Sequence, residues 1–278
     1  MLTSRTNKEN KPNQEKLTQQ TIDDFGRQWT SCRENEGYYG SVDHFSKLVS
    51  PVLGIHEIEN ATIAEIGVGT GRISHSLMLL GATHLYAIEP SKAIEVAKTN
   101  LSMWGDKISF INKRGGSVGN LASLDFVFSI GVIHHIVDPI PVLQAAKKSL
   151  KTGGSLVIWV YGKEGNSIYL FALKPIRTLM QLAPNKCSWA FAWTIFPFAK
   201  MYGKLALMLK IPLWRYFRSI YNNLSNIQQA LVIHDQITPS VARYYTRDNI
   251  QTLLIKSGFK KISIRAVEGY SWIAKATK

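Results

Sequence analysis

The chain has 278 residues, 45% of them hydrophobic, which is enough for one large core with an elaboration built on it. Its two cysteines, Cys32 and Cys187, lack the spacing of metal ligands and indicate neither a disulfide framework nor a zinc site. No run reaches the roughly 18–20 apolar residues of a membrane-spanning helix, and the polar N-terminus is unlike a secretory signal, so we expect a cytoplasmic protein.

The formal net charge of +14 is concentrated in the second half of the chain. Residues 1–164 hold 17 Lys and Arg against 16 Asp and Glu, whereas residues 165–278 hold 16 against 3. A basic segment of this kind favours an anionic partner, which would be nucleic acid, a phosphorylated small molecule or a membrane surface.

The first predicted elements follow a polar stretch. Residues 1–20 carry no apolar pattern, and we expect a flexible tail there. Residues 61–64 predict a short buried strand, and residues 73–80 have the apolar spacing of a helix. Between strand and helix lies Glu65-Ile66-Gly67-Val68-Gly69-Thr70-Gly71-Arg72, a glycine-rich turn in which bare backbone can approach a ligand closely.

The spacing of these glycines indicates the class of ligand. A dinucleotide-binding turn has the pattern G-x-G-x-x-G, in which the third glycine lets the helix pack closely. Here Arg72 occupies the third position and Gly71 comes one residue earlier, which gives E-x-G-x-G-x-G. This pattern resembles motif I of the class I methyltransferases, which bind S-adenosylmethionine.

Three further segments resemble the same family, in the family's order. The strand expected over residues 84–88 ends in Glu89-Pro90-Ser91, where an acidic residue can accept both ribose hydroxyls of a nucleoside. Residues 123–135 resemble the fourth strand and its loop, and residues 150–158 resemble the turn and strand that follow. The resemblance implies S-adenosylmethionine as cofactor and these binding residues: Glu65, Gly67, Gly69, Gly71, Glu89, Pro90, Ser91, Ser129 and Gly131.

The resemblance also implies the fold. We expect an α/β, Rossmann-like class I methyltransferase fold with a seven-stranded, mostly parallel sheet and a helical insertion after strand five. Residues 25–29 and Tyr38-Tyr39 match an aromatic lead-in that covers the cofactor in many members. Residues 241–278, with a helix capped at Thr246 and a final pair of strands, resemble the end of that fold.

One segment departs from the family. After the third strand, expected over residues 107–111, many members carry an acidic residue that contacts the adenine amino group. Residues 112–121 contain none. Asn112, Ser117 or a backbone carbonyl are the alternatives for that contact.

Five side chains are candidates for a general base. His134 and His135, in the loop after the fourth strand, either shape the loop under the methyl donor or take part in the chemistry. The sequence does not rank them against the other three candidates, which are His234, Tyr161 and Glu268.

Residues 165–234 hold eight Lys or Arg and no acidic residue, among many aromatic and aliphatic side chains. Prolines at 175, 184, 197 and 212 predict several short helices. The position of this segment predicts an insertion over the strand ends, where open parallel sheets bind ligands. Three interpretations of this insertion stay open. It forms a helical cap with solvated lysines, a substrate lid with a cationic, aromatic pocket, or a segment that lies on an anionic membrane surface.

Four segments and three functions follow from these patterns. We expect a tail over 1–20, a lead-in and cofactor half over 21–164, the insertion over 165–240 and the closing elements over 241–278.

The first hypothesis is O- or C-methylation of a small or lipid-linked acceptor. The second is an RNA methyltransferase, which the missing N/D-P-P-Y/F motif and the lack of a separate RNA-binding module disfavour. The third is a non-catalytic binder of the same fold.

Overall fold

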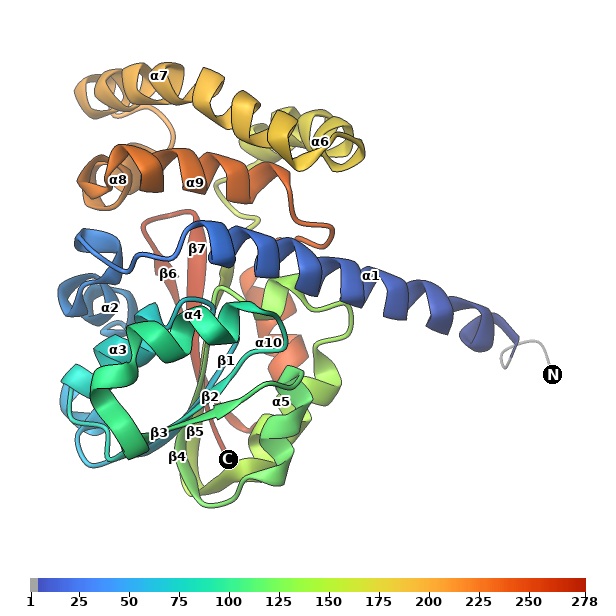
Figure 1. Ribbon diagram of the computed structural model, residues 1–278, viewed down its shortest axis with the longest axis vertical. Coiled ribbons are helices and arrows are strands. Elements are labelled where there is room, and N and C mark those ends of the chain that lie inside the picture. Colours follow the sequence, from blue (N-terminus) through green and yellow to red (C-terminus); the bar gives the residue numbers. More distant parts are fainter. Residues whose placement is uncertain (1–4) are drawn as a thin grey trace.

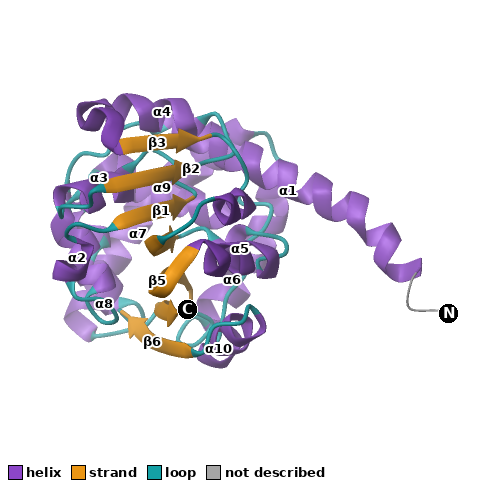
Figure 2. Ribbon diagram, turned by 90° about the horizontal axis from the view of Figure 1, so that it is seen from below, coloured by secondary structure: helices purple, strands orange, loops and turns teal. Residues whose placement is uncertain are grey.

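The computed structural model describes residues 5–278 and is built around a seven-stranded sheet in the order β3-β2-β1-β4-β5-β7-β6 (Figure 2). The strands run parallel except β7, which pairs antiparallel with β5 and β6. This arrangement confirms the expected sheet. The strands are β1 Thr62–Ile66, β2 His84–Ile88, β3 Ile108–Ile111, β4 Leu124–Ile130, β5 Leu150–Tyr161, β6 Lys261–Val267 and β7 Ser271–Thr277.

Helices cover both faces of the sheet because its central strands are apolar on both sides. On one face pack α2 (Val42–Val49) and α3 (Arg72–Leu79), which bury Phe45 and Leu77. On the other face pack α5 (Ile140–Ser149) and α10 (Arg247–Lys256), which bury Leu143 and Leu254. A further helix, α4 (Ala93–Asn100), follows β2. The side chain of Thr246 accepts a hydrogen bond from the Asn249 N–H, so the predicted cap of α10 is confirmed.

The N-terminal segment differs from the flexible tail expected over residues 1–20. From Arg5 it forms a long helix, α1 (Arg5–Ser31), and residues 1–4 lie outside the described residues. Contacts with distant parts of the chain hold this helix: the Arg114 guanidinium pairs with the Glu15 carboxylate, and the Asp24 carboxylate accepts the backbone N–H of Ser240. Such tertiary contacts override weak local propensity, which is why the polar sequence gave no sign of the helix.

The insertion forms a helical cap over the carboxyl ends of the parallel strands, on the same side as α1 (Figure 1). Its prolines do not all break helices as predicted, because Pro175 and Pro197 lie inside helices. Both rings are exposed, so they displace no packed neighbour, and packing of the opposite helix face offsets the lost backbone hydrogen bond. The cap helices are α6 Ser167–Leu182, α7 Asn185–Leu209, α8 Trp214–Ser219 and α9 Asn226–Ile237.

None of the helices within residues 5–278 has both the length and the apolar character required to cross a membrane.

Candidate active site

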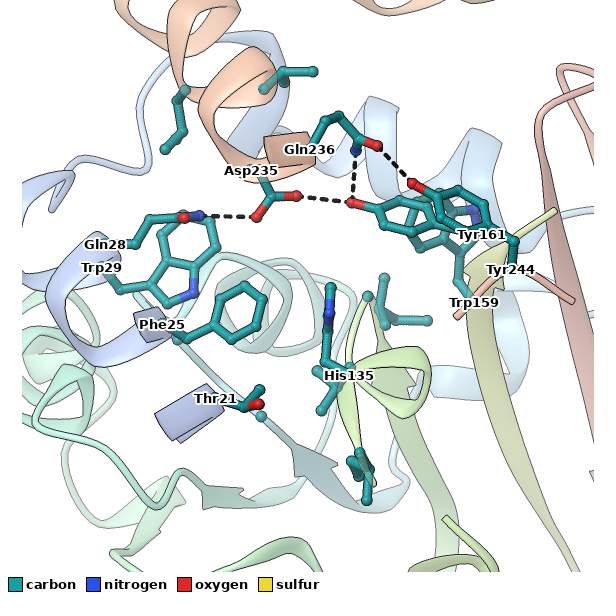
Figure 3. Close-up of a pocket in the computed structure, with 18 of the residues that line it drawn as sticks. Thr21, Phe25, Gln28, Trp29, His135, Trp159, Tyr161, Asp235, Gln236 and Tyr244 are labelled. Carbon is teal, nitrogen blue, oxygen red and sulfur yellow. Dashed lines mark hydrogen bonds between the residues drawn. The ribbon is translucent and has the colours of Figure 1, made fainter. Parts of the chain in front are cut away.

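A cavity of about 1190 Å³ lies between the sheet and the cap. Its floor is formed by the glycine-rich turn after β1 and by the ends of β2, β4 and β5, and its roof by helices of the insertion. The side chains of Phe25 and Trp29 on α1 close one side (Figure 3). The insertion therefore covers the strand ends, as its position in the sequence predicted.

The three glycines of the turn have different surroundings, although each has a positive φ. A Cβ on Gly67 would lie 2.4 Å from Val132 Cγ2, and a Cβ on Gly71 would lie 2.8 Å from Leu101 Cδ1. These two glycines allow close packing of the protein on itself. The three atoms nearest to a Cβ on Gly69 would all belong to the Trp29 ring, the closest at 3.4 Å, so Gly69 keeps open the space between the turn and α1.

Glu89, at the end of β2, holds the shape of this site through backbone contacts. One carboxylate oxygen accepts the Gly69 N–H at 3.1 Å, and the other accepts the Ser91 N–H at 3.0 Å. The carboxylate is 6% exposed and borders the cavity together with Pro90. Since each oxygen can accept more than one hydrogen bond, acceptor capacity remains for a ligand.

Glu65, at the end of β1, is a buried acid beside the same turn. Its side chain is 1% exposed and accepts a hydrogen bond from the Ser74 hydroxyl. Burial raises the pKa of Glu65 to about 8, although the Ser74 hydrogen bond opposes this shift. A positive charge bound nearby would favour the ionised carboxylate.

Six of the nine predicted cofactor residues border the cavity, and the other three support it from behind. Those at the cavity are Glu65, Gly67, Gly69, Glu89, Pro90 and Gly131. The side chain of Ser91 caps the start of α4 by accepting the Ala93 N–H, and Ser129 is fully buried beneath β1. The predicted order of strand, turn and acidic strand end therefore brings one set of residues together.

In the loop after β3, Asn112 does not line the cavity. The Asn112 side-chain amide donates to the backbone carbonyl of Glu89 at 2.8 Å, so it braces the Glu89 loop. Ser117 has a buried hydroxyl without a hydrogen-bond partner, but it does not line the cavity. Of this loop and its neighbours, Arg114 and Gly115 reach the cavity.

The two adjacent histidines have different environments. His134 is fully buried against Tyr161, with ring centroids 4.1 Å apart, and does not line the cavity. His135 does line it, and its Nδ1 lies 2.6 Å from the Val241 carbonyl. A carbonyl only accepts, so Nδ1 carries the proton and Nε2 has a free lone pair when the ring is neutral. Burial lowers the pKa of His135, which favours that neutral form.

A second polar cluster lies above His135 and is centred on Asp235 of α9 (Figure 3). One carboxylate oxygen of Asp235 accepts the Tyr161 hydroxyl at 2.7 Å, and the other accepts the Gln28 amide at 3.0 Å. The Gln236 amide donates to the Tyr161 oxygen at 2.9 Å and its carbonyl accepts the Tyr244 hydroxyl at 3.1 Å. Burial, followed by the charge of Asp235, raises the pKa of Tyr161 and keeps the phenol protonated.

Of the five candidates for a general base, His135 and Tyr161 lie at the cavity. His234 is buried against Trp189, with ring centroids 4.2 Å apart, and does not line the cavity. Glu268 is in the turn between β6 and β7, also away from it. The sequence analysis missed Asp235, for which one signal existed: it is the first acidic residue after the acid-free run 165–234.

These residues fit S-adenosylmethionine. The turn leaves backbone bare where Gly69 faces the cavity, a buried carboxylate with free acceptor capacity stands at Glu89, and a second buried carboxyl group stands at Glu65. A ligand with hydroxyl donors and a positive charge would meet acceptors and anions there.

Comparisons with known proteins agree with this fit. A family model described as "Methyltransferase domain" matches residues 64–158. The ubiquinone biosynthesis O-methyltransferase of Colwellia psychrerythraea is 28% identical over 125 residues, 44% of this chain and 50% of that protein. A tRNA U34 carboxymethyltransferase of Idiomarina loihiensis is 25% identical over 117 residues, 40% of this chain and 36% of that protein. The chain thus spans about half the length, or less, of these curated relatives.

A solved structure has a similar fold over most of the chain. The 1,6-didemethyltoxoflavin-N1-methyltransferase of Burkholderia thailandensis, solved with bound S-adenosylhomocysteine, has a TM-score of 0.51 at 14% identity, and the match covers 83% of this chain and 76% of that one. At this identity the likeness supports the fold. Residues 64–158 thus match a methyltransferase domain, the surrounding fold is that of a solved methyltransferase, and S-adenosylmethionine is the cofactor that fits the site.

Proposed function

We propose that the protein transfers a methyl group from S-adenosylmethionine to a hydroxyl or acidic carbon of a small or lipid-linked acceptor. The observation that carries this proposal is the single cavity that joins the glycine-rich turn to the cluster of His135, Tyr161 and Asp235. One end offers a cofactor cradle, and the other offers a proton acceptor among aromatic walls.

The cofactor supplies an electrophilic methyl group on a sulfonium centre. In the proposal, Glu89 and the bare backbone at Gly69 hold the nucleoside end, and Glu65 lies beside the positive charge. The cap and the aromatic side chains of α1 line the cavity, so a bound acceptor would be held beside the methyl group with less water around it.

Proton removal is assigned to His135. The acceptor loses a proton to Nε2 as its oxygen or carbon forms the new bond to the methyl group, and the bond from sulfur to that methyl group breaks. The nearby charge of Asp235 favours the imidazolium that results, since that charge raises the pKa of His135. Asp235 also fixes the Tyr161 hydroxyl, whose hydrogen bonds define the acceptor side of the cavity.

The alternative functions have less support. An RNA acceptor calls for a basic surface at the site, whereas the side of the cavity under the cap is lined mainly by aromatic and aliphatic side chains. A non-catalytic binder would have no use for a neutral histidine and a hydrogen-bonded, half-buried carboxylate at the same cavity as the glycine-rich turn.

The test is methyl transfer by the full chain from radiolabelled S-adenosylmethionine to a panel of phenols and enols, with and without an alkyl chain. His135→Ala should lower the rate by about 10²- to 10⁴-fold, the usual contribution of a general base, while calorimetry gives unchanged cofactor affinity. His56→Ala, an exposed histidine outside the cavity, is the matched control. Label found only in RNA, or no transfer by a protein that binds the cofactor, would contradict the proposal.

A further inference from the structure

The outermost helix of the cap, α7, exposes several of its large apolar side chains. Phe198, Met201, Leu205 and Met208 are spaced three, four and three residues apart, which places them on one stripe of the helix. Their exposed fractions are 59%, 65%, 45% and 79%. We call these four residues the outer stripe. In Figure 1, α7 lies in the layer farthest from the sheet, with α8 and α9 between.

The opposite side of α7 carries small residues instead. Ser188, Ala192, Gly203 and Ala206 are buried against the rest of the cap. A Cβ on Gly203 would lie 2.5 Å from the Phe217 ring of α8, so this helix approaches its neighbours closely. A helix that packs only on the cap normally buries its large apolar residues. Phe191 and Ile195 of α7 do face inward, to the cavity, but the four large residues of the outer stripe are exposed. This exposure indicates that the outer stripe meets another apolar phase.

The charge around the outer stripe has one sign. Residues 165–234 contain no Asp or Glu. Lys204 lies on the flank of the stripe, and Lys186 lies on the same side of α7 five turns nearer its start; both are exposed. Of the eight basic residues in this run, Arg177 is unavailable to an outside partner because its guanidinium donates to the backbone carbonyl of Gln236 at 2.6 Å and to the Tyr244 hydroxyl.

The inner sides of α6 and α7 line the cavity. Leu173 and Ile176 of α6 and Phe191 and Ile195 of α7 contribute apolar side chains to it. One layer of helix therefore lies between the outer stripe and the upper, apolar part of the cavity, while the polar cluster at Asp235 lies deeper.

We propose that the outer stripe and its flanking lysines bind the surface of an anionic lipid bilayer, and that the acceptor carries an apolar tail held in the upper cavity. The tail rests on the proposed function, whereas the lipid contact does not. Amphipathic helices with Lys and Arg beside aromatic and aliphatic residues lie in the headgroup region in this way.

Two other partners fit the surface less well. A second copy of the chain would place lysines opposite lysines in a two-fold contact, which repels. RNA would pair with the lysines but would leave Phe198, Met201, Leu205 and Met208 without apolar partners. An anionic bilayer satisfies the charge and the apolar stripe together.

Flotation of the full chain with lipid vesicles tests the contact. Recovery should be high with vesicles containing phosphatidylglycerol, low with pure phosphatidylcholine, and should fall as salt rises, because the Debye length shrinks from about 10 Å at 0.1 M to about 3 Å at 1 M. Each flanking lysine contributes about 1 kcal/mol near an anionic surface, or about fivefold in partitioning. Lys186→Gln with Lys204→Gln should therefore lower partitioning by about 25-fold.

Matched controls separate this surface from general charge and hydrophobicity. Met201→Glu with Met208→Glu should abolish flotation, whereas Met103→Glu with Ile255→Glu should not, since those two exposed residues lie outside the cap. Lys256→Gln with Lys260→Gln controls for the loss of two lysines. Calorimetry of cofactor binding on every variant shows that each is folded.

The outcomes are distinct. Equal recovery with neutral and anionic vesicles, or flotation unchanged in the Met201 and Met208 variant, overturns the lipid contact. Loss of a dimer or of RNA binding in the same variant, without any vesicle binding, overturns it in favour of those partners. Vesicle binding by a protein that methylates no acceptor would leave the contact standing and contradict the proposed function instead.

Discussion

Two alanine substitutions in the glycine-rich turn should separate its structural role from its binding role. In Gly67→Ala the new Cβ would lie 2.4 Å from Val132 Cγ2 at a φ of +79°. A left-handed backbone costs about 1–2 kcal/mol in a residue with a side chain, and overpacking a core adds about 1–3 kcal/mol. The free energy of unfolding of Gly67→Ala should therefore be about 2–5 kcal/mol lower than that of the parent protein.

Gly69→Ala should behave differently. Its Cβ would meet Trp29 at 3.4 Å, an ordinary contact, so only the backbone term of about 1–2 kcal/mol applies to stability. The methyl group would occupy the gap between turn and α1, and cofactor binding should weaken by about 1–3 kcal/mol, or roughly 5- to 150-fold.

Thermal unfolding and calorimetry with S-adenosylhomocysteine measure the two effects. A loss of 1 kcal/mol lowers the melting temperature by about 2–4 °C in a chain of this size class, so Gly67→Ala should melt roughly 4–20 °C lower. Adding Val132→Ala should restore part of that loss, since it removes the methyl groups that clash. The reasoning fails if Gly67→Ala melts like the parent protein, or if Gly69→Ala binds the cofactor with unchanged affinity.

Three further predictions concern the carboxyl groups. Glu89→Ala should weaken cofactor binding by about 1.5–3 kcal/mol, roughly tenfold or more, by calorimetry; equal loss of nicotinamide dinucleotide binding would contradict the assigned ligand class. Glu65 has a folded-state pKa of about 8, above its unfolded value near 4.5, so the folded protein holds this proton more tightly than the unfolded chain does. Stability should decline by on the order of 4 kcal/mol as pH rises from about 4.5 to 8, and Glu65→Gln should flatten that decline in denaturant titrations. Asp235→Asn removes a charge that raises the pKa of His135, so the acidic limb of the pH–rate profile should move to lower pH. An unmoved limb would show that Asp235 does not act on the general base.

The sheet and the cofactor turn were predictable because their signals are local. The predicted strand over residues 84–88 coincides with β2, and the strand expected at 61–64 became Thr62–Ile66. The glycines and Glu89 were readable from spacing, since adjacent parallel strands end at the same edge of the sheet.

The acceptor side was not predictable because its contacts join distant parts of the chain. Asp235 bonds to Gln28 and Tyr161, which are 207 and 74 residues away in the sequence. His134 and His135 are neighbours in the sequence. Only the packing around them shows that His135 faces the cavity and that His134 packs against Tyr161. Periodicity carries no information about such pairings.

The hydrogen bond between Gln28 and Asp235 has a consequence for the order in which the protein is made. The two residues are 207 positions apart, and a ribosome adding about 5–20 residues per second needs roughly 10–40 s to synthesise that stretch. Within this time β1 to β5 and the glycine-rich turn are synthesised first, and α9 with its carboxylate is synthesised at the end. A nascent chain therefore contains every residue of the glycine-rich turn well before it contains Asp235, so the wall that we propose faces the acceptor is the last part of the cavity to be made.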